Sequence, residues 1–104
     1  MRIVAKASHI RADLADLRRS FPADADFARA LRAVTFQLRR LGVSEAGNLG
    51  YKLDGWSRLA FSSGNAARAE LRVIFRAYAE GFELRAFGHR SDPESVYLRA
   101  RARR

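Results

Sequence analysis

The sequence contains no cysteine, a single methionine, only two prolines and no long hydrophobic run. Without cysteine there is no disulfide, no thiolate nucleophile and no cysteine-ligated metal, which fits a reducing compartment. The opening residues, MRIVAKASHIRADLADL, carry charges too early and too often for a secretory signal, and no stretch approaches the length of a membrane span. We therefore expect a soluble, cytoplasmic protein.

Motifs for metal ions and nucleotides are missing as well. The two histidines, His9 and His89, are far apart along the chain, and the carboxylates show no spacing typical of metal ligands. The glycines of GNLGYKLDG (47–55) lack the strand-to-helix context that phosphate-binding loops require. We expect neither a metal nor a cofactor.

Positive charge is what the sequence has in excess. Twenty Lys and Arg stand against eleven Asp and Glu, so the formal net charge is +9 and the pI is about 11.3. The excess is present in both halves, with nine positive and five negative groups in residues 1–51 and eleven and six in residues 52–104. A folded domain this basic indicates a polyanionic partner, nucleic acid first. A coding bias that enriches Arg and Ala is the alternative explanation.

The first half of the chain predicts a short strand and two helices. The strand is RIVAKA (2–7), and Ser8 is the expected N-cap of the first helix, which ends at Pro22. The second helix starts at Asp24 or Asp26 and ends at Gly42. The apolar residues of both helices recur at helical spacing: Ile10, Leu14, Leu17, Phe21, and then Phe27, Leu31, Val34, Leu38, Leu41. This pattern predicts an antiparallel helical hairpin that packs on another layer.

The second half changes to the alternation of strands. WSRLAFS (56–62), AELRVIFRAYA (69–79) and FELRAFGHR (82–90) predict three strands, and Asp92-Pro93 opens a last helix that contains Val96 and Tyr97. On the third strand, alternation places Gly88 and Ala86 on one face, opposite Phe87 and His89. We expect one α+β domain over residues 1–104, a helical hairpin on a small antiparallel sheet in the order β-α-α-β-β-β-α.

Three stretches of the second half resemble the RelE/ParE toxin superfamily. WSRLAF (56–61) and LRVIFR (71–76) are similar to its Trp-Arg-Leu strand and its central Arg-Val-Ile-Tyr strand. GHRSDPESVYLRARAR (88–103) resembles the Gly-His/Lys-Arg, turn, Val-Tyr and basic-helix signature of the RelE branch. The resemblance implies the RelE/ParE fold and a bacterial toxin that is neutralised by a cognate antitoxin.

The RelE branch cleaves messenger RNA in the ribosomal decoding site, so the resemblance implies the ribosome and messenger RNA as further partners. Carried over onto this sequence, Arg72 matches the strand Arg of the nucleases, Arg90 the Arg of the closing signature, and Tyr97 the Tyr after Val. Lys52 and Arg58 lie where family members carry one or two lysines.

Metal-free RNA cleavage needs a base for the ribose 2′-hydroxyl, positive charge for the phosphoryl oxygens and a proton for the leaving 5′-oxygen. We assign Arg72 to the phosphate with Arg58 assisting, because a guanidinium grips two phosphate oxygens at once. Tyr97 is the candidate base, since cations within a few ångströms favour a phenolate. Arg90 is expected to balance the leaving oxygen, with Lys52 as an alternative donor.

Further residues are predicted to contact RNA: Arg85, His89, Arg99 and Arg101. His89 is more readily interpreted as a structural or substrate-neighbouring residue than as a catalytic one. The alternatives for Arg72 are a solvated outward position and an ion pair with Glu70 or Glu83, and the alternative for Tyr97 is a core position.

Two other functions remain open at the level of sequence. A ParE-type inhibitor of DNA gyrase shares the fold and has no nuclease activity; it predicts a buried Tyr97 and diverging arginines. A nucleic-acid-binding module without chemistry predicts salt-sensitive binding and no cleavage.

Overall fold

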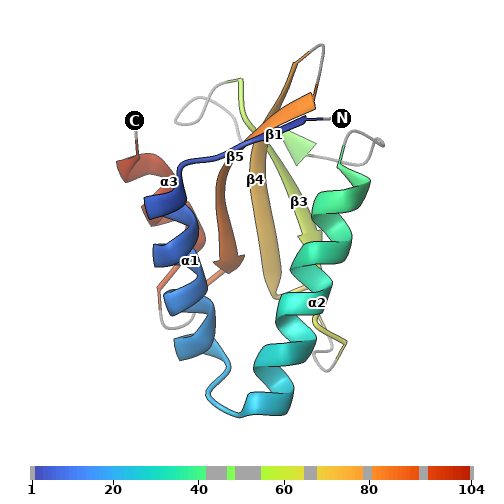
Figure 1. Ribbon diagram of the computed structural model, residues 1–104, viewed down its shortest axis with the longest axis vertical. Helices are drawn as coiled ribbons and strands as arrows, with labels where there is room; N and C mark the ends of the chain where they lie inside the picture. Colours follow the sequence, from blue (N-terminus) through green and yellow to red (C-terminus); the bar gives the residue numbers. More distant parts are fainter. Residues whose placement is uncertain are drawn as a thin grey trace.

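The sheet has its helices on both faces (Figure 1). The computed structural model describes residues 2–41, 47–48, 55–64, 68–78, 81–91 and 94–103. The elements along the chain are β1 (Arg2–Val4), α1 (Ala7–Ser20), α2 (Asp24–Arg40), β2 (Gly47–Asn48), β3 (Ser57–Phe61), β4 (Leu71–Tyr78), β5 (Gly81–His89) and α3 (Val96–Ala102). The α+β class is confirmed, and no helix among these residues is long and apolar enough to cross a bilayer.

The sheet differs from the prediction in two ways. Its strand order is β1-β5-β4-β3-β2, and the two-residue strand β2, which pairs with β3, adds a strand to the predicted order. The prediction of an antiparallel sheet is wrong for β1, which runs parallel to β5, while the other neighbours are antiparallel. Parallel neighbours need a long crossover connection, and here that connection includes the helical hairpin.

The hairpin packs on the face of the sheet that carries Leu71, Val73 and Phe75. The predicted stripes are confirmed, because Leu17 and Val34 are fully buried and Leu14, Phe21, Phe27, Leu31 and Leu38 pack against the same core. The predicted cap is wrong: α1 begins at Ala7 after Lys6, so Ser8 already lies inside the first turn and makes no cap bond. Gly42, the expected end of the second helix, lies outside the described residues.

A bulge in β5 reverses the expected alternation. Ile74 pairs with Ala86 and Phe75 with Leu84, so Arg85 is one residue too many for the ladder. Beyond it, Phe87 joins the core under the hairpin, whereas Ala86 packs with Trp56, Val96 and Ala100 beneath α3. The prediction that Phe87 faces away from the apolar residues of its strand is therefore wrong, because a bulge shifts every later side chain to the other face.

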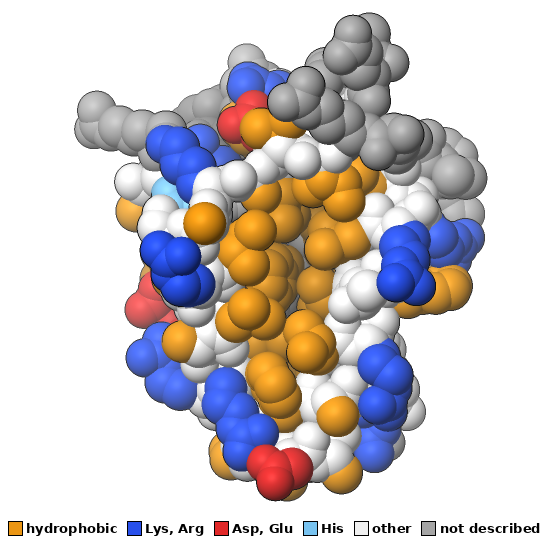
Figure 2. Space-filling view, in the orientation of Figure 1, with side chains coloured by type: hydrophobic (Ala, Val, Ile, Leu, Met, Phe, Trp, Pro, Cys, Tyr) orange, Lys and Arg blue, Asp and Glu red, His pale blue; other side chains and the backbone are white. Residues whose placement is uncertain are grey.

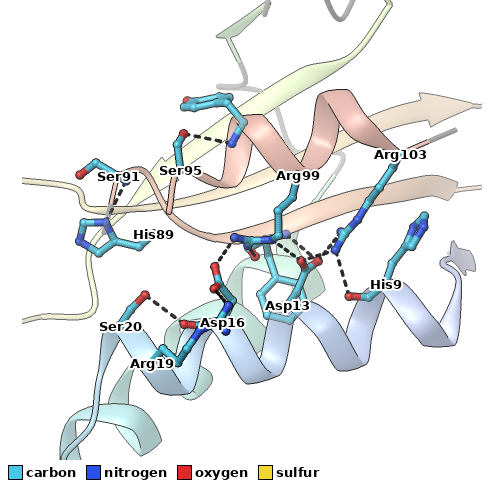
Figure 3. A network of polar contacts seen from close by, with 12 residues as sticks. His9, Asp13, Asp16, Arg19, Ser20, His89, Ser91, Ser95, Arg99 and Arg103 are labelled. Atoms are coloured by element: carbon cyan, nitrogen blue, oxygen red, sulfur yellow. Dashed lines mark hydrogen bonds and ion pairs between the residues drawn. The ribbon is translucent and has the colours of Figure 1, made fainter. Parts of the chain in front are cut away.

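Ion pairs join α3 to α1 across the edge of β5, and we call Asp13, Asp16, Arg99 and Arg103 the edge clamp (Figure 3). Arg99 Nε donates to Asp13 Oδ1 at 3.0 Å, Arg99 also bonds Asp16, and Arg103 donates to both oxygens of Asp13 at 2.8 Å. The carboxylates are 2% exposed and the guanidiniums 12% and 9%. Each buried carboxylate is thus matched by more than one hydrogen bond.

The edge clamp also takes the place of a missing strand. β1 pairs only with Gly81, Phe82 and Glu83, so it leaves the rest of the β5 edge uncovered. Phe87 N–H donates to Asp13 Oδ2 at 3.2 Å, and Phe87 C=O accepts from Arg99 Nη2 at 2.9 Å. Side chains of the clamp therefore satisfy backbone groups that a neighbouring strand would otherwise pair.

Gly88 makes room for the clamp. Its φ is +149°, and a Cβ built on it would lie 2.6 Å from Arg99 Nη2. Any side chain here would combine an unfavourable backbone conformation with a collision against a guanidinium that three acceptors hold in place.

Substitution of Arg99 by Ala is expected to lower the free energy of unfolding by about 3–5 kcal/mol, because it leaves Asp13 and Asp16 buried with fewer partners. Arg101→Ala, on the exposed side of the same helix, is the matched control and should stay within about 0.5 kcal/mol of the parent. Urea unfolding followed by circular dichroism measures both. Equal stability of the two variants would contradict a structural role for the clamp.

Gly88→Ala is expected to destabilise the fold more than Gly55→Ala. Gly55 also has a positive φ, +84°, but a Cβ there would meet nothing within 4 Å, so its variant carries only the backbone strain of about 1–2 kcal/mol. The difference between the two unfolding free energies contains the collision with Arg99 together with the larger backbone strain of an alanine at φ +149°. If the Gly88 variant is no less stable than the Gly55 variant, the close approach to Arg99 has no energetic consequence.

Candidate nucleic-acid site

Tyr97 lies at the start of α3, above the face of the sheet that is opposite the hairpin. Ser95 is the N-cap, and its Oγ accepts from the Tyr97 N–H at 3.2 Å, so the helix begins later than the predicted Asp92-Pro93 start. The Tyr97 ring is half-buried against the cluster that contains Ile74 and Val96. Ring packing and the cap together fix where the phenol oxygen lies.

Two arginines from different strands donate to that oxygen. Arg72 Nε lies 3.0 Å from Tyr97 Oη, and Arg58 Nη1 lies 3.5 Å from it, which is a long hydrogen bond. Arg72 Nη1 also donates to the carbonyls of Ala69 and Leu71, at 2.7 and 2.9 Å. The Arg72 guanidinium is therefore anchored by its own chain while one edge points at the phenol.

The register of the strands explains why these residues meet. Ala60 pairs with Arg72 and Arg58 with Ile74 in neighbouring antiparallel strands, and Arg58 and Arg72 both project to the α3 face. Among the described residues no carboxylate pairs with either guanidinium; Glu83 pairs instead with Arg76, and Glu70 accepts from Ser63. The cluster of Arg58, Arg72 and Tyr97, which we call the phenol cluster, thus keeps its positive charge available to an anion.

Arg90, another predicted catalytic residue, makes no hydrogen bond to the phenol oxygen. Arg90 follows β5, and its backbone N–H donates to Glu70 C=O at 2.9 Å. Its side chain is exposed and makes no hydrogen bond or ion pair with the part of the chain that the structure describes. Lys52 lies outside the described residues.

The four residues predicted to contact RNA, Arg85, His89, Arg99 and Arg101, have different structural environments. Arg99 belongs to the buried edge clamp, so it is a structural residue, contrary to the predicted RNA contact. His89 lies on the hairpin side, with its ring 6.3 Å from Phe21 and its Nδ1 accepting from the Ser91 N–H at 3.0 Å. It is therefore on the face of the sheet opposite the phenol cluster.

Arg85 and Arg101 lie on the same side of the sheet as Tyr97. Arg85 donates to Ala100 C=O at 2.8 Å, its guanidinium stacks 5.0 Å from the Trp56 ring, and burial lowers its pKa. Arg101 is exposed and follows Tyr97 by four residues, which places both on one side of α3. Arg101 therefore extends the cationic surface around the phenol.

Trp56 and Arg76 form a further contact that the sequence did not single out as part of this face. The Arg76 guanidinium lies 4.5 Å from the Trp56 ring, so two cations, Arg76 and Arg85, contact the buried indole. The sequence signal for this contact was the alternation of Arg72, Ile74 and Arg76 along β4, which places the three side chains on one face of the strand. Trp56 is a core residue, as its position at the start of a strand predicts.

No group of three or more His, Asp or Glu side chains within the described ranges is arranged to hold a metal ion. The chain was compared with protein-family models, with curated proteins and with solved structures, and none of them matches it. The functional interpretation therefore rests on the geometry of the phenol cluster.

Tyr97→Phe is expected to leave the fold intact, because the ring keeps its packing and only the hydrogen bonds from Arg72 and Arg58 are lost, at a cost of about 1 kcal/mol. Tyr97→Ala also removes the ring and should lower the unfolding free energy by about 2–3 kcal/mol. Urea unfolding of both variants measures the difference. Equal losses would mean that the phenol oxygen, not the ring, holds α3 in place.

Proposed function

We propose that the protein is the toxin of a bacterial toxin–antitoxin pair, of the RelE type within the RelE/ParE superfamily, and that it cleaves messenger RNA on the ribosome. The observation that supports this proposal is the phenol cluster: a tyrosine oxygen that accepts hydrogen bonds from two guanidiniums on the basic α3 face. The RelE-like fold, the antitoxin and the ribosome enter with the motifs of residues 56–61, 71–76 and 88–103.

The cluster suits the attack of a ribose 2′-oxygen on the adjacent phosphorus. In this step the 2′-oxygen–phosphorus bond forms, the bond from phosphorus to the 5′-oxygen breaks, and a 2′,3′-cyclic phosphate results. Tyr97 Oη, which accepts hydrogen bonds from Arg72 and Arg58, takes the 2′ proton as the base. Arg72, held by two backbone carbonyls, is preorganised for the charge on the phosphoryl oxygens.

The leaving 5′-oxygen also needs charge and a proton. Arg90, exposed at the end of β5, supplies positive charge for this oxygen, and water supplies the proton because a guanidinium is a poor acid. A site with so few acid–base groups depends on an outside scaffold to align the 2′-hydroxyl with the phosphorus. The ribosome fills that role in the proposal, and free RNA is expected to be cut poorly.

Ribosomes programmed with a defined messenger, with mapping of the new 5′ ends, give the test. Arg72→Ala should slow cleavage by about 10²–10³-fold through loss of a preorganised donor. Tyr97→Phe should slow it by about 10²–10⁴-fold through loss of the base. Arg40→Ala, an exposed arginine of α2, is the control and should cleave at the parent rate.

Two further measurements make the outcome decisive. If both site variants cleave like the parent, the assignment of Arg72 and Tyr97 is wrong. If the parent cuts no messenger but blocks supercoiling by DNA gyrase, the ParE-type function replaces the proposal. Salt-sensitive RNA binding with neither effect would identify a non-catalytic binding module.

A further inference from the structure

Glu70 is a buried acidic residue that the proposed mechanism does not use. It precedes β4 and is only 8% exposed, and its two carboxylate oxygens accept from Ser63 N–H at 2.9 Å and from Ser63 Oγ at 3.0 Å. No ion pair joins Glu70 to another residue of the described ranges. Burying a carboxylate against neutral donors is unfavourable by itself, so we searched for what this contact holds in place.

The contact ties the start of β4 to the end of β3. The ladder between these two strands ends at the pair of Phe61 and Leu71, and the contact of Ser63 with Glu70 lies just beyond that pair. On the other side, the Glu70 C=O accepts from the Arg90 N–H at 2.9 Å, just past the end of the ladder between β4 and β5. Glu70 is therefore fixed twice, by its side chain toward β3 and by its backbone toward β5.

The backbone on both sides of Glu70 holds the Arg72 guanidinium. Arg72 Nη1 donates to the carbonyls of Ala69 and Leu71, which are the two chain neighbours of Glu70. The Ala69 carbonyl belongs to the planar peptide unit that ends at the Cα of Glu70, so its direction follows the backbone conformation of that residue. The orientation of Arg72, whose Nε lies 3.0 Å from Tyr97 Oη, therefore depends on how Glu70 is held.

We propose that Glu70 is a positioning residue for Arg72, which it holds through the Ala69 carbonyl, and that Ser63 fixes the Glu70 side chain for this purpose. The inference rests on the proposed function, in which Arg72 is the donor to the phosphoryl oxygens. A donor that is held in advance stabilises the transition state without further ordering, and a misplacement of about 1 Å can slow a reaction about 10²-fold. Glu70 thus acts on the cleavage rate through the geometry of Arg72.

A double-mutant cycle on messenger cleavage by programmed ribosomes tests this coupling, at a temperature where unfolding curves show every variant folded. Glu70→Ala should lower kcat at least about tenfold and change KM for the programmed ribosome less than about threefold, because the charge on the phosphoryl oxygens develops in the transition state. In the Arg72→Ala background the same substitution should change kcat less than about twofold, since the residue that Glu70 positions is gone.

Glu70→Gln is the conservative variant. Its amide oxygen can accept from the Ser63 N–H while its amide nitrogen donates to Ser63 Oγ, so kcat should stay within about threefold of the parent, because a hydroxyl group can either donate or accept. A fall in kcat as deep as that of Glu70→Ala would overturn the explanation by hydrogen bonds. Ser63→Ala removes the bond from the hydroxyl and keeps the bond from the backbone, so its kcat should lie between those of the parent and Glu70→Ala.

Val34→Ala is the matched control for a loss of stability without a loss of positioning. Val34 is buried in the core beneath the hairpin, on the side of the sheet opposite the phenol cluster. Figure 2 shows the molecule from this hairpin side, where a band of hydrophobic side chains lies between α1 and α2. Val34→Ala should destabilise the fold but keep kcat of the folded protein within about twofold in both backgrounds.

A measurement without RNA follows the arginine itself. In protein labelled with ¹⁵N-arginine, the Arg72 Nε–H signal is identified by its absence from Arg72→Ala. The hydrogen bond to Tyr97 should slow the exchange of this proton with water. Glu70→Ala should speed the exchange at least about tenfold, whereas Val34→Ala should leave it within about twofold of the parent.

The two measurements separate this inference from the proposed function. If Arg72→Ala cleaves like the parent, the nuclease assignment is wrong, and the Nε–H exchange decides whether Glu70 positions Arg72. If Arg72→Ala is slow but Glu70→Ala slows both backgrounds equally, or leaves the exchange unchanged, Glu70 is not a positioning residue. An effect of Val34→Ala on kcat as large as that of Glu70→Ala would show that lost stability slows cleavage.

Discussion

The uncovered edge of β5 determines where α1 and α3 lie. β1 pairs with Gly81–Glu83, and within the described ranges no strand pairs with the N–H and C=O of Phe87 on this edge of β5. Asp13 and Arg99 pair with these groups instead, and their mutual ion pair is stable in the interior because each also has further partners. The same helix that carries Arg99 carries Tyr97 two residues earlier. The position of the phenol over Arg72 therefore depends on how β5 pairs its edge.

Local sequence patterns predicted the helices and the longer strands. They did not predict which strands pair across long stretches of sequence. The hairpin and the three longer strands were readable because apolar residues such as Leu17, Val34 and Val73 repeat with the period of their element. The parallel pairing of β1 depends on a strand almost eighty residues away, about which RIV says nothing. The bulge at Arg85 was hidden as well, because FELRAFGHR reads as one unbroken alternating strand and gives no sign of an extra residue.

The site residues were predictable where they share one face of a strand. The prediction failed for a charged residue whose ion-pair partners lie far away in the sequence. Arg72, Arg90 and Tyr97 were expected to converge. Arg72 donates to Tyr97 at 3.0 Å, whereas the Arg90 side chain makes no hydrogen bond to the phenol. Arg99 was grouped with the basic tail, although its carboxylate partners lie in α1. Helical spacing held the missing signal. Arg99 and Arg103 share one side of α3, and Tyr97 and Arg101 share another, so the tail has a structural side and a cationic, solvent-facing side.

The net charge of +9 thus has three separate physical roles. Arg99 and Arg103 neutralise buried carboxylates, Arg58 and Arg72 surround a phenol, and Arg32 and Arg39 border an apolar groove. α1 joins the apolar layer of the hairpin to the clamp, because Leu14 packs against the core while its neighbour Asp13 binds Arg99. The two faces of the sheet therefore differ in the chemistry of their side chains, and adjacent residues of α1 connect them structurally.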